Sequence, residues 1–181
     1  NVNDYEKNLC EVFKHSYKIL KPDGLLIMTF NNKNFSVCLA LLISVFKSGF
    51  CWRKDAIYFQ DGILNYKHTA HTKAAGSPYG DFIYIFEKRM KKRTHIRKKI
   101  SPENLIFNIK KIISNYSVAK KNKEKDIEYQ KIAIFKKVIP VIQNYYLNRD
   151  AKDINNIYNY FKEDFLQNLY EKKAESKKIN N

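Results

Sequence analysis

The stretch ILKPDGLLIMTFNNK, residues 19–33, decides the fold, because it joins a helix end, a turn and a strand. Pro22 disfavours helical geometry at the residue before it, so a helix that arrives here ends by Lys21. The run LLIMTF, residues 25–30, is apolar at both alternating sets of positions, which is typical of a central strand covered on both faces. Two amides, Asn31 and Asn32, close the run. The sequence therefore predicts a helix, a turn and a buried strand that ends in polar side chains.

The elements around this stretch alternate between helix and strand. The first helix begins near Asp4, a candidate cap, and carries apolar residues at helical spacing. A second, strongly apolar helix covers residues 34–48 and ends at Gly49. Residues 50–59 and 81–88 are rich in aromatic and β-branched side chains, which predicts two more strands. This order indicates an α/β fold. The apolar positions of the first helix are Tyr5, Leu9, Val12, Phe13, Tyr17 and Leu20.

The composition changes near residue 90. All five glycines lie in the first 80 residues, and the basic run EKRMKKRTHIRKK follows at residues 87–99. We therefore predict an α/β part over 1–90 and a basic, all-helical extension over 91–181. The extension shows helical periodicity over 101–116, over 123–147 with a kink or break at Pro140, and again after Asp153. Its predicted inward stripes include Ile109, Phe135, Val138, Tyr158, Phe161 and Phe165.

The net charge and the composition limit the classes of partner. A formal net charge of +16 favours a polyanion, most often nucleic acid, although a membrane surface or an acidic protein also fits. An AT-rich coding sequence would also produce many lysines.

The apolar run at 35–46 is too short to span a bilayer. The cysteines form no CxxC pair and indicate reduced thiols in a cytoplasmic protein, while HTAH at 68–71 lacks the further ligands of a metal site. Because no Met or secretory signal opens the chain, we expect it to begin inside a longer protein.

Three segments carry a resemblance to a known family. LKPDGLLIMTFNNK, ALLISVFKSGF and AAGSPYGDFIYIFEKR, within residues 4–90, resemble the adenine-specific DNA methylases among the class I S-adenosylmethionine-dependent methyltransferases. In that family an LKPGG or LKPDG turn leads into the fifth strand, TFHH or TFHN ends it, and a GS...GD turn opens the last strand. The resemblance implies the last strands of a Rossmann-like methyltransferase sheet, with an antiparallel final strand.

The chain also departs from that family. Asn31 and Asn32 stand where the family more often has His, so an imidazole role is not carried over. The glycine-rich cofactor loop and the DPPY or NPPY tetrapeptide, which holds a flipped adenine, are both absent. The resemblance therefore implies a carboxyl-terminal portion without catalytic residues of its own. Its partners would be DNA and the missing amino-terminal half, which would bind most of the S-adenosyl-L-methionine.

The predicted site residues follow from sheet topology. Ligands of doubly wound sheets bind beyond the carboxyl ends of the strands, which is where the first strand and the 60–80 loop would present polar side chains. Alternatively, the two asparagines only cap the next helix, in competition with Asn34, and the loop and basic run are only solvated. The expected substrate contacts are Asn31, Asn32, Lys33, Lys67, His68, His71, Lys73, Ser77 and Tyr79, and the expected DNA-backbone contacts are Lys91, Lys92, Arg93 and Arg97.

Three functions remain open from the sequence. The first is adenine-specific DNA methylation, with an inactive isolated chain. The second is a non-catalytic nucleic-acid-binding module whose helical part binds and whose α/β part is a scaffold. The third is a methyltransferase that acts on RNA or on a small molecule, which the turn motif permits.

Overall fold

The computed structural model describes residues 1–32, 34–61, 80–88, 100–118, 127–147, 154 and 157–161. The predicted first helix, three strands and next three helices are confirmed. Of the helix predicted after Asp153, a short 3₁₀ segment is described, and its remainder lies outside these residues. The elements in chain order are α1 (Val2–Ile19), β1 (Leu25–Phe30), α2 (Phe35–Lys47), β2 (Cys51–Asp61), β3 (Gly80–Glu87), α4 (Pro102–Val118), α5 (Ile127–Tyr146) and the 3₁₀ helix η2 (Ile157–Phe161).

The described strands form a small antiparallel sheet in the order β1-β3-β2. The last strand, β3, lies in the middle and runs antiparallel to both neighbours, so β1 and β2 are parallel to each other. The prediction that residues 25–30 form a central strand covered on both faces is wrong for the described part of the chain. Leu25 is 40% exposed and Ile27 is 59% exposed. The reason is that β1 is an edge strand, and the described helices leave one of its faces bare.

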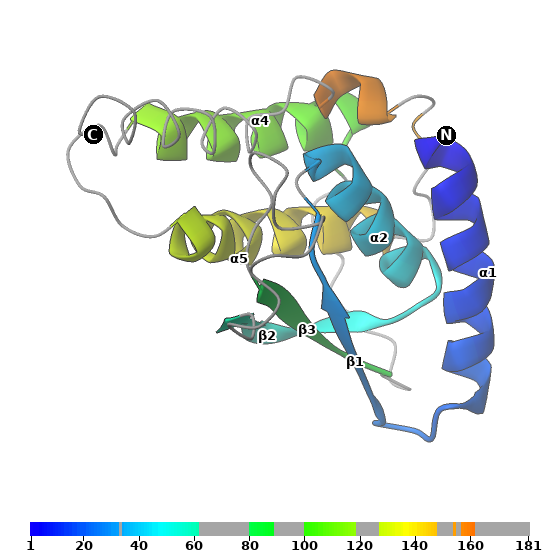
Figure 1. The fold of residues 1–181 in the computed structure, drawn as a ribbon. Helices are drawn as coiled ribbons and strands as arrows, with labels where there is room; N and C mark the ends of the chain where they lie inside the picture. Colours follow the sequence, from blue (N-terminus) through cyan, green and yellow to red (C-terminus); the bar gives the residue numbers. More distant parts are fainter. Residues whose placement is uncertain are drawn as a thin grey trace.

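One face of the sheet packs on helices. Figure 1 shows α2, α4 and α5 on the same side of the sheet, with α1 beside α2. The α2 helix is buried along almost its whole length, and its Phe46 ring lies 5.8 Å from the Phe86 ring of β3. Phe135 of α5 meets Tyr84 edge-on at 6.1 Å. The sheet therefore has a dry aromatic inner face, which we define by its β3 residues Phe82, Tyr84 and Phe86.

The inner face, the helices of the α/β part and the later helices share one core. A single cluster of buried apolar residues runs from Phe13 in α1 to Phe161 in η2. The Trp52 backbone N–H of β2 donates to Oε1 of Gln143 in α5 at 2.6 Å, which joins the two parts by a buried hydrogen bond. The division of the chain at residue 90 stays a prediction, and the described helices beyond it pack directly on the α/β elements.

Two helix details differ from prediction. The cap of α1 is Asn1, whose side chain accepts from the Asp4 backbone N–H at 3.1 Å, while the Asp4 carboxylate pairs back as the third residue of a capping box. Asp4 is therefore not the cap. The α5 helix continues through Pro140, so the helix is not divided there, while the alternative of a kink stays a prediction. Val12, one of the apolar positions of α1, is 57% exposed.

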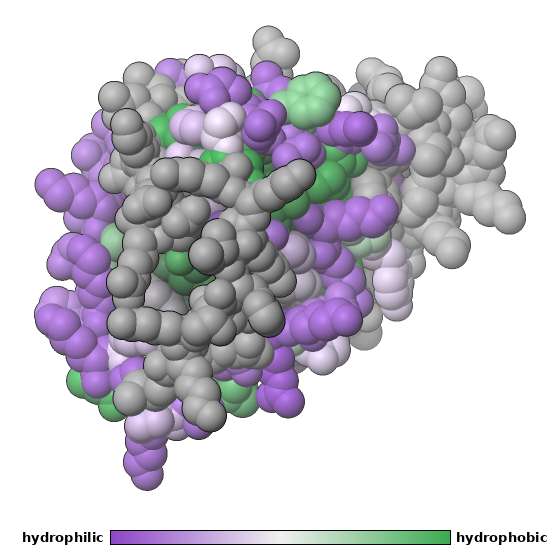
Figure 2. All heavy atoms as spheres, turned by 180° about the vertical axis from the view of Figure 1, so that it is seen from behind, coloured by the Kyte–Doolittle hydropathy of each residue, from purple (hydrophilic) through white to green (hydrophobic). Residues whose placement is uncertain are grey.

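The described residues on one face of the molecule are largely polar. Figure 2 shows hydrophilic side chains over much of the back of the molecule, with hydrophobic ones between them. Among the helices that the structure describes, none combines the length and apolar character needed to cross a membrane. Cys10 and Cys38 are buried, and Cys51 is partly buried. The HTAH histidines lie outside the described residues, and those residues contain no cluster of three or more His, Cys, Asp or Glu suited to a metal.

Candidate functional site

The carboxyl end of β1 meets the beginning of β3. Phe30 pairs with Phe82, and Asp61 at the end of β2 pairs with Gly80. Asn31 and both attachment points of the segment at 62–79 therefore lie at one end of the sheet. We call this region the amide end and define it by Asn31, Asn32 and Gly80.

Hydrogen bonds fix both asparagines at the amide end. The Asn31 side-chain amide donates to the backbone oxygen of Gly80, and its Oδ1 accepts from Nζ of Lys131 at 3.3 Å. The Asn32 backbone oxygen accepts from the same Nζ at 2.8 Å, and its Oδ1 accepts from the Asn34 N–H at 2.8 Å. Both asparagines are therefore held by partners from several elements rather than left mobile.

These contacts bear on the capping alternative. Asn34 occupies the cap position of α2, and its own side chain makes no cap hydrogen bond. The Asn32 side chain bonds the backbone two residues on, which is an Asx-turn that leads the chain into the helix. The Asn31 side chain reaches across to Gly80 instead. Asn31 is thus no cap, and Asn32 supports the helix start only indirectly.

Lys131 is the residue of this region that the sequence did not reveal. Its side chain extends from α5 and is fully buried, at 0% exposure. Its Nζ lies 4.8 Å from the Phe82 ring centroid and 6.0 Å from that of Phe135, within cation–π range. A buried ammonium needs such contacts together with hydrogen bonds to offset its desolvation. Lys131 therefore joins α5 to the end of β1 by bonds that a hydrophobic residue would not supply.

The helical spacing places Lys131 among apolar residues of its predicted helix. The residue stands four positions before Phe135 and three before Ile134, so it falls on the apolar stripe of the helix predicted over 123–147. A single lysine in an apolar stripe usually extends its amine to solvent. Here the acceptors that keep it inside belong to residues 100 and 99 positions earlier in the chain.

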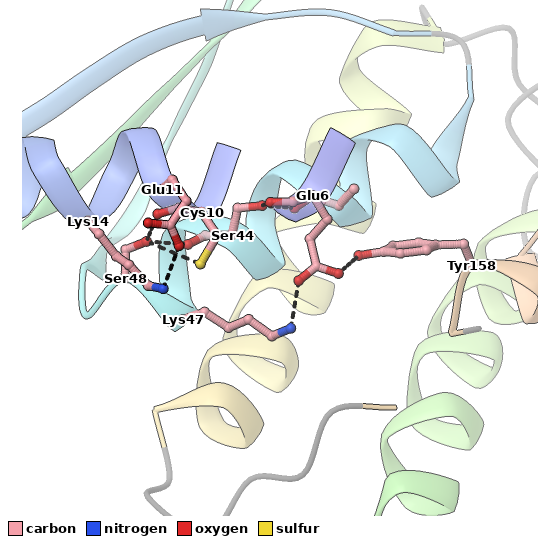
Figure 3. A network of polar contacts seen from close by, with 9 residues as sticks. Glu6, Cys10, Glu11, Lys14, Ser44, Lys47, Ser48 and Tyr158 are labelled. Atoms are coloured by element: carbon pink, nitrogen blue, oxygen red, sulfur yellow. Dashed lines mark hydrogen bonds and ion pairs between the residues drawn. The ribbon is translucent and has the colours of Figure 1, made fainter. Parts of the chain in front are cut away.

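A second polar cluster joins α1, α2 and η2 (Figure 3). Glu6 Oε1 pairs with Lys47 Nζ at 2.6 Å, and the Tyr158 hydroxyl donates to the other carboxylate oxygen. Ser44 Oγ donates to the Glu6 backbone oxygen at 3.0 Å. The side chains of Lys47 and Glu6 are only 22% and 15% exposed. Because both carboxylate oxygens are occupied from within the fold, this cluster acts as a structural clasp, and we call these four residues the Glu6 clasp.

Two tyrosines near α2, Tyr84 and Tyr5, have raised pKa values. Burial, and in second place the neighbouring Cys38, raises the pKa of the Tyr84 phenol well above its ordinary value of 10.0. The same two causes raise the pKa of Tyr5. Both phenols therefore stay neutral at physiological pH.

The remaining predicted contacts fall outside the described residues. Only Asn31 and Asn32 of the predicted set are placed, and their contact with a substrate stays a prediction. The contacts that lie outside are Lys33, Lys67, His68, His71, Lys73, Ser77, Tyr79, Lys91, Lys92, Arg93 and Arg97.

Comparison with known proteins finds no matching family model, no matching curated protein and no matching solved structure.

Proposed function

We propose that this chain is the carboxyl-terminal part of an S-adenosylmethionine-dependent DNA methyltransferase that modifies the exocyclic nitrogen of adenine. The observation that carries the proposal is the bond between Asn31 and Gly80. These residues belong to two of the resembling motifs, TFNNK and GSPYGD, and they are 49 positions apart. The motifs that suggested the family from sequence thus meet at the end of the sheet where a substrate is expected.

The methyl donor requires further protein. The two glycines at described turns do not form an open cradle, because a Cβ at Gly24 would lie 2.6 Å from the Leu20 side chain and one at Gly49 would lie 3.3 Å from the Tyr17 ring. Neither of these two turns therefore offers the open glycine loop that the resemblance expects for the cofactor. In this proposal, a partner segment with the glycine loop and the NPPY-type tetrapeptide holds both cofactor and target base.

This chain would contribute position and charge. The amide end would border the substrate, with Lys131 as a positioning residue that fixes Asn31 and Asn32 through the contacts at 3.3 and 2.8 Å. The net charge of +16 would favour association with the phosphate backbone. Because methyl transfer depends on the alignment of two bound reactants, small shifts of these amides would slow the reaction.

Reconstitution tests the proposal. The isolated chain, incubated with radiolabelled cofactor and unmethylated DNA, is expected to transfer no methyl groups. Addition of the polypeptide encoded upstream of Asn1, as a separate chain, is expected to give labelled N6-methyladenine in the DNA. Turnover by the isolated chain, or labelling of RNA but not DNA by the mixture, would contradict the proposal.

A matched pair of variants tests the amide end. Asn31→Ala in the reconstituted enzyme should lower kcat/KM at least about tenfold, since it removes the contacts to Gly80 and Lys131. Asn8→Ala, an exposed asparagine on α1, should leave the rate unchanged. Equal rates for the two variants would show that the amide end does not contribute to the substrate site.

The net charge favours a second candidate, a non-catalytic nucleic-acid-binding module. In that case the full chain alone would bind duplex DNA with a steep salt dependence, and the reconstituted mixture would not methylate it. Methylation by the mixture would exclude this candidate.

A further inference from the structure

Two exposed aromatic side chains lie beyond the sheet, Phe107 on α4 and Tyr160 on η2. Phe107 is 61% exposed and Tyr160 is 51% exposed. Their elements already bury other apolar side chains, which are Leu105 and Ile109 on α4 and Tyr158 on η2. A surface helix normally turns polar side chains to the water. The packing of α4 and η2 on the core therefore does not account for these two rings.

A lysine ammonium lies over each of the two rings. Nζ of Lys110 is 5.6 Å from the centroid of the Tyr160 ring. Nζ of Lys111 is 6.0 Å from the centroid of the Phe107 ring, and both distances are within cation–π range. The first contact joins α4 to η2, which Figure 1 shows in the layer farthest from the sheet. We call these four residues the lysine–aromatic face.

The two lysines of this face carry charge that α4 does not neutralise. Both are exposed, and neither has a carboxylate three or four positions away in the sequence. An ion pair between adjacent turns of α4 therefore does not take up their charge. The single acidic residue of α4, Glu103, lies in its first turn. The lysine–aromatic face thus complements an anionic ligand, and its rings offer contact area to a flat group.

We propose that the lysine–aromatic face binds single-stranded DNA, with one base stacked on each ring and a phosphate paired with each ammonium. A strand of nucleic acid alternates flat bases with anionic phosphates, which is what interleaved rings and cations recognise. The strand is unpaired, because the bases of a duplex are stacked on one another and do not reach the rings. The choice of DNA over RNA, and that choice alone, rests on the proposed function.

This face is distinct from the amide end. It is formed by side chains of α4 and η2, whereas the amide end lies where β1 ends and β3 begins. A membrane surface is a less suitable ligand, because an interfacial helix needs a continuous apolar face. Phe107 instead has Asn104, Lys110 and Lys111 as its neighbours one turn away. The polar surroundings of the ring therefore favour a polyanion that carries its own flat groups.

Fluorescence anisotropy with the full chain tests the face. The probe is a labelled oligodeoxythymidine of about 15 nucleotides, long enough to cover one such site. Phe107→Ala and Tyr160→Ala should each raise the Kd about tenfold, since each removes a stacking surface. Phe107→Trp keeps a ring and should bind at least as tightly as wild type. Tyr58→Ala is the matched control, because Tyr58 is 55% exposed but lies on β2, and it should leave the Kd unchanged.

Salt dependence separates stacking from charge. The double variant Lys110→Gln with Lys111→Gln should lower the slope of log Kd against log salt by about 1.4, since each phosphate contact on a single strand contributes about 0.7. Phe107→Ala should keep the wild-type slope, and it should leave the Kd for a duplex of the same length unchanged. Circular dichroism of every variant should match wild type, since each change lies at an exposed position.

Four results would overturn the proposal. They are no binding of the oligodeoxythymidine, an equal Kd for Phe107→Ala and Tyr58→Ala, an equal loss on the duplex, or Phe107-dependent binding to phosphatidylserine vesicles without binding to the oligonucleotide. The last result would assign the face to a membrane surface. Tighter binding of oligouridine than of oligodeoxythymidine would overturn the choice of DNA.

This experiment and the reconstitution can fail separately. Phe107-dependent binding of the single strand, by a chain whose reconstituted mixture does not methylate DNA, would refute the proposed function and leave the lysine–aromatic face. Methylation by the mixture, without Phe107-dependent binding of the single strand, would do the reverse.

Discussion

The two sides of β1 carry similar side chains in opposite environments: one side faces the helices, and the other, which we call the outer face and define by Leu25 and Ile27, is exposed. Along β1, Leu26 and Met28 pack toward the core, while their neighbours Leu25 and Ile27 are exposed. Every side chain among these four is apolar. The side-chain types along β1 are therefore the same on its covered side and on its exposed side. The exposed fraction of each residue depends instead on which other elements pack against that side.

The largest effect is expected on the inner face. Phe86→Ala should lower the free energy of unfolding by about 3–5 kcal/mol, because it removes a fully buried ring that packs on Phe46 and Tyr84. Ile27→Ala, on the outer face, should change it by less than about 0.5 kcal/mol. Urea denaturation of the free chain measures both. Similar losses would mean that the outer face is covered in the free chain.

A smaller effect is expected at the Glu6 clasp, which holds α1 and η2 to α2 around the inner-face core. Glu6→Gln should cost roughly 2 kcal/mol, since Lys47 loses its carboxylate partner in a place where both side chains are largely buried. Glu11→Gln is the control, because its pair with Lys14 lies at the surface, and it should have no measurable effect. If both variants unfold at the same urea concentration, the clasp contributes nothing.

The burial of Tyr84 on the inner face should make the free energy of unfolding depend on alkaline pH. Burial holds the pKa of Tyr84 above its unfolded value of 10.0. The unfolded chain therefore releases this proton first, so the free energy of unfolding falls as pH rises beyond about 10. Tyr84→Phe should remove part of this decline. Urea titrations at several pH values between 8 and 11 measure it, and an unchanged slope in the variant would show that Tyr84 does not titrate on unfolding.

The smallest effect on folding is expected on the outer face. Leu25→Thr with Ile27→Thr should leave the free energy of unfolding within about 0.5 kcal/mol of wild type per site. The same double variant should aggregate less at high protein concentration, because it removes apolar side chains beside an open strand edge. Light scattering measures this. Greater aggregation by the variant would contradict an exposed outer face.

Local patterns predicted most of the secondary structure. Helical spacing located α1, α2, α4 and α5, and Pro22 with Gly24 marked the turn before β1, because these signals act within a few residues. The edge position of β1 was not predictable. An apolar strand has the same sequence whether its neighbour lies in the same chain or elsewhere, so periodicity alone could not distinguish a central strand from an uncovered one.

The residues of the amide end also separate into those that the sequence predicts and those that it does not. Asn31 and Asn32 were predictable as residues at a strand end, since a strand that stops at two polar side chains presents them at the sheet's end. Lys131 was not, because its burial depends on how α5 docks against residues about a hundred positions earlier. Asn31 was weighed as a helix cap, and its bond to Gly80 arises from β-sheet register, which the sequence does not state.

The Glu6 clasp also constrains the order in which the chain folds during synthesis. Glu6 and Tyr158 are separated by 152 positions, so the ribosome adds the hydroxyl partner roughly 8 to 30 s after the carboxylate at ordinary elongation rates. From the synthesis of Lys47 until that of Tyr158, Lys47 and Ser44 are the clasp members available to Glu6. The α1 helix is thus anchored in two stages, and its final anchor arrives only after α5 has been made.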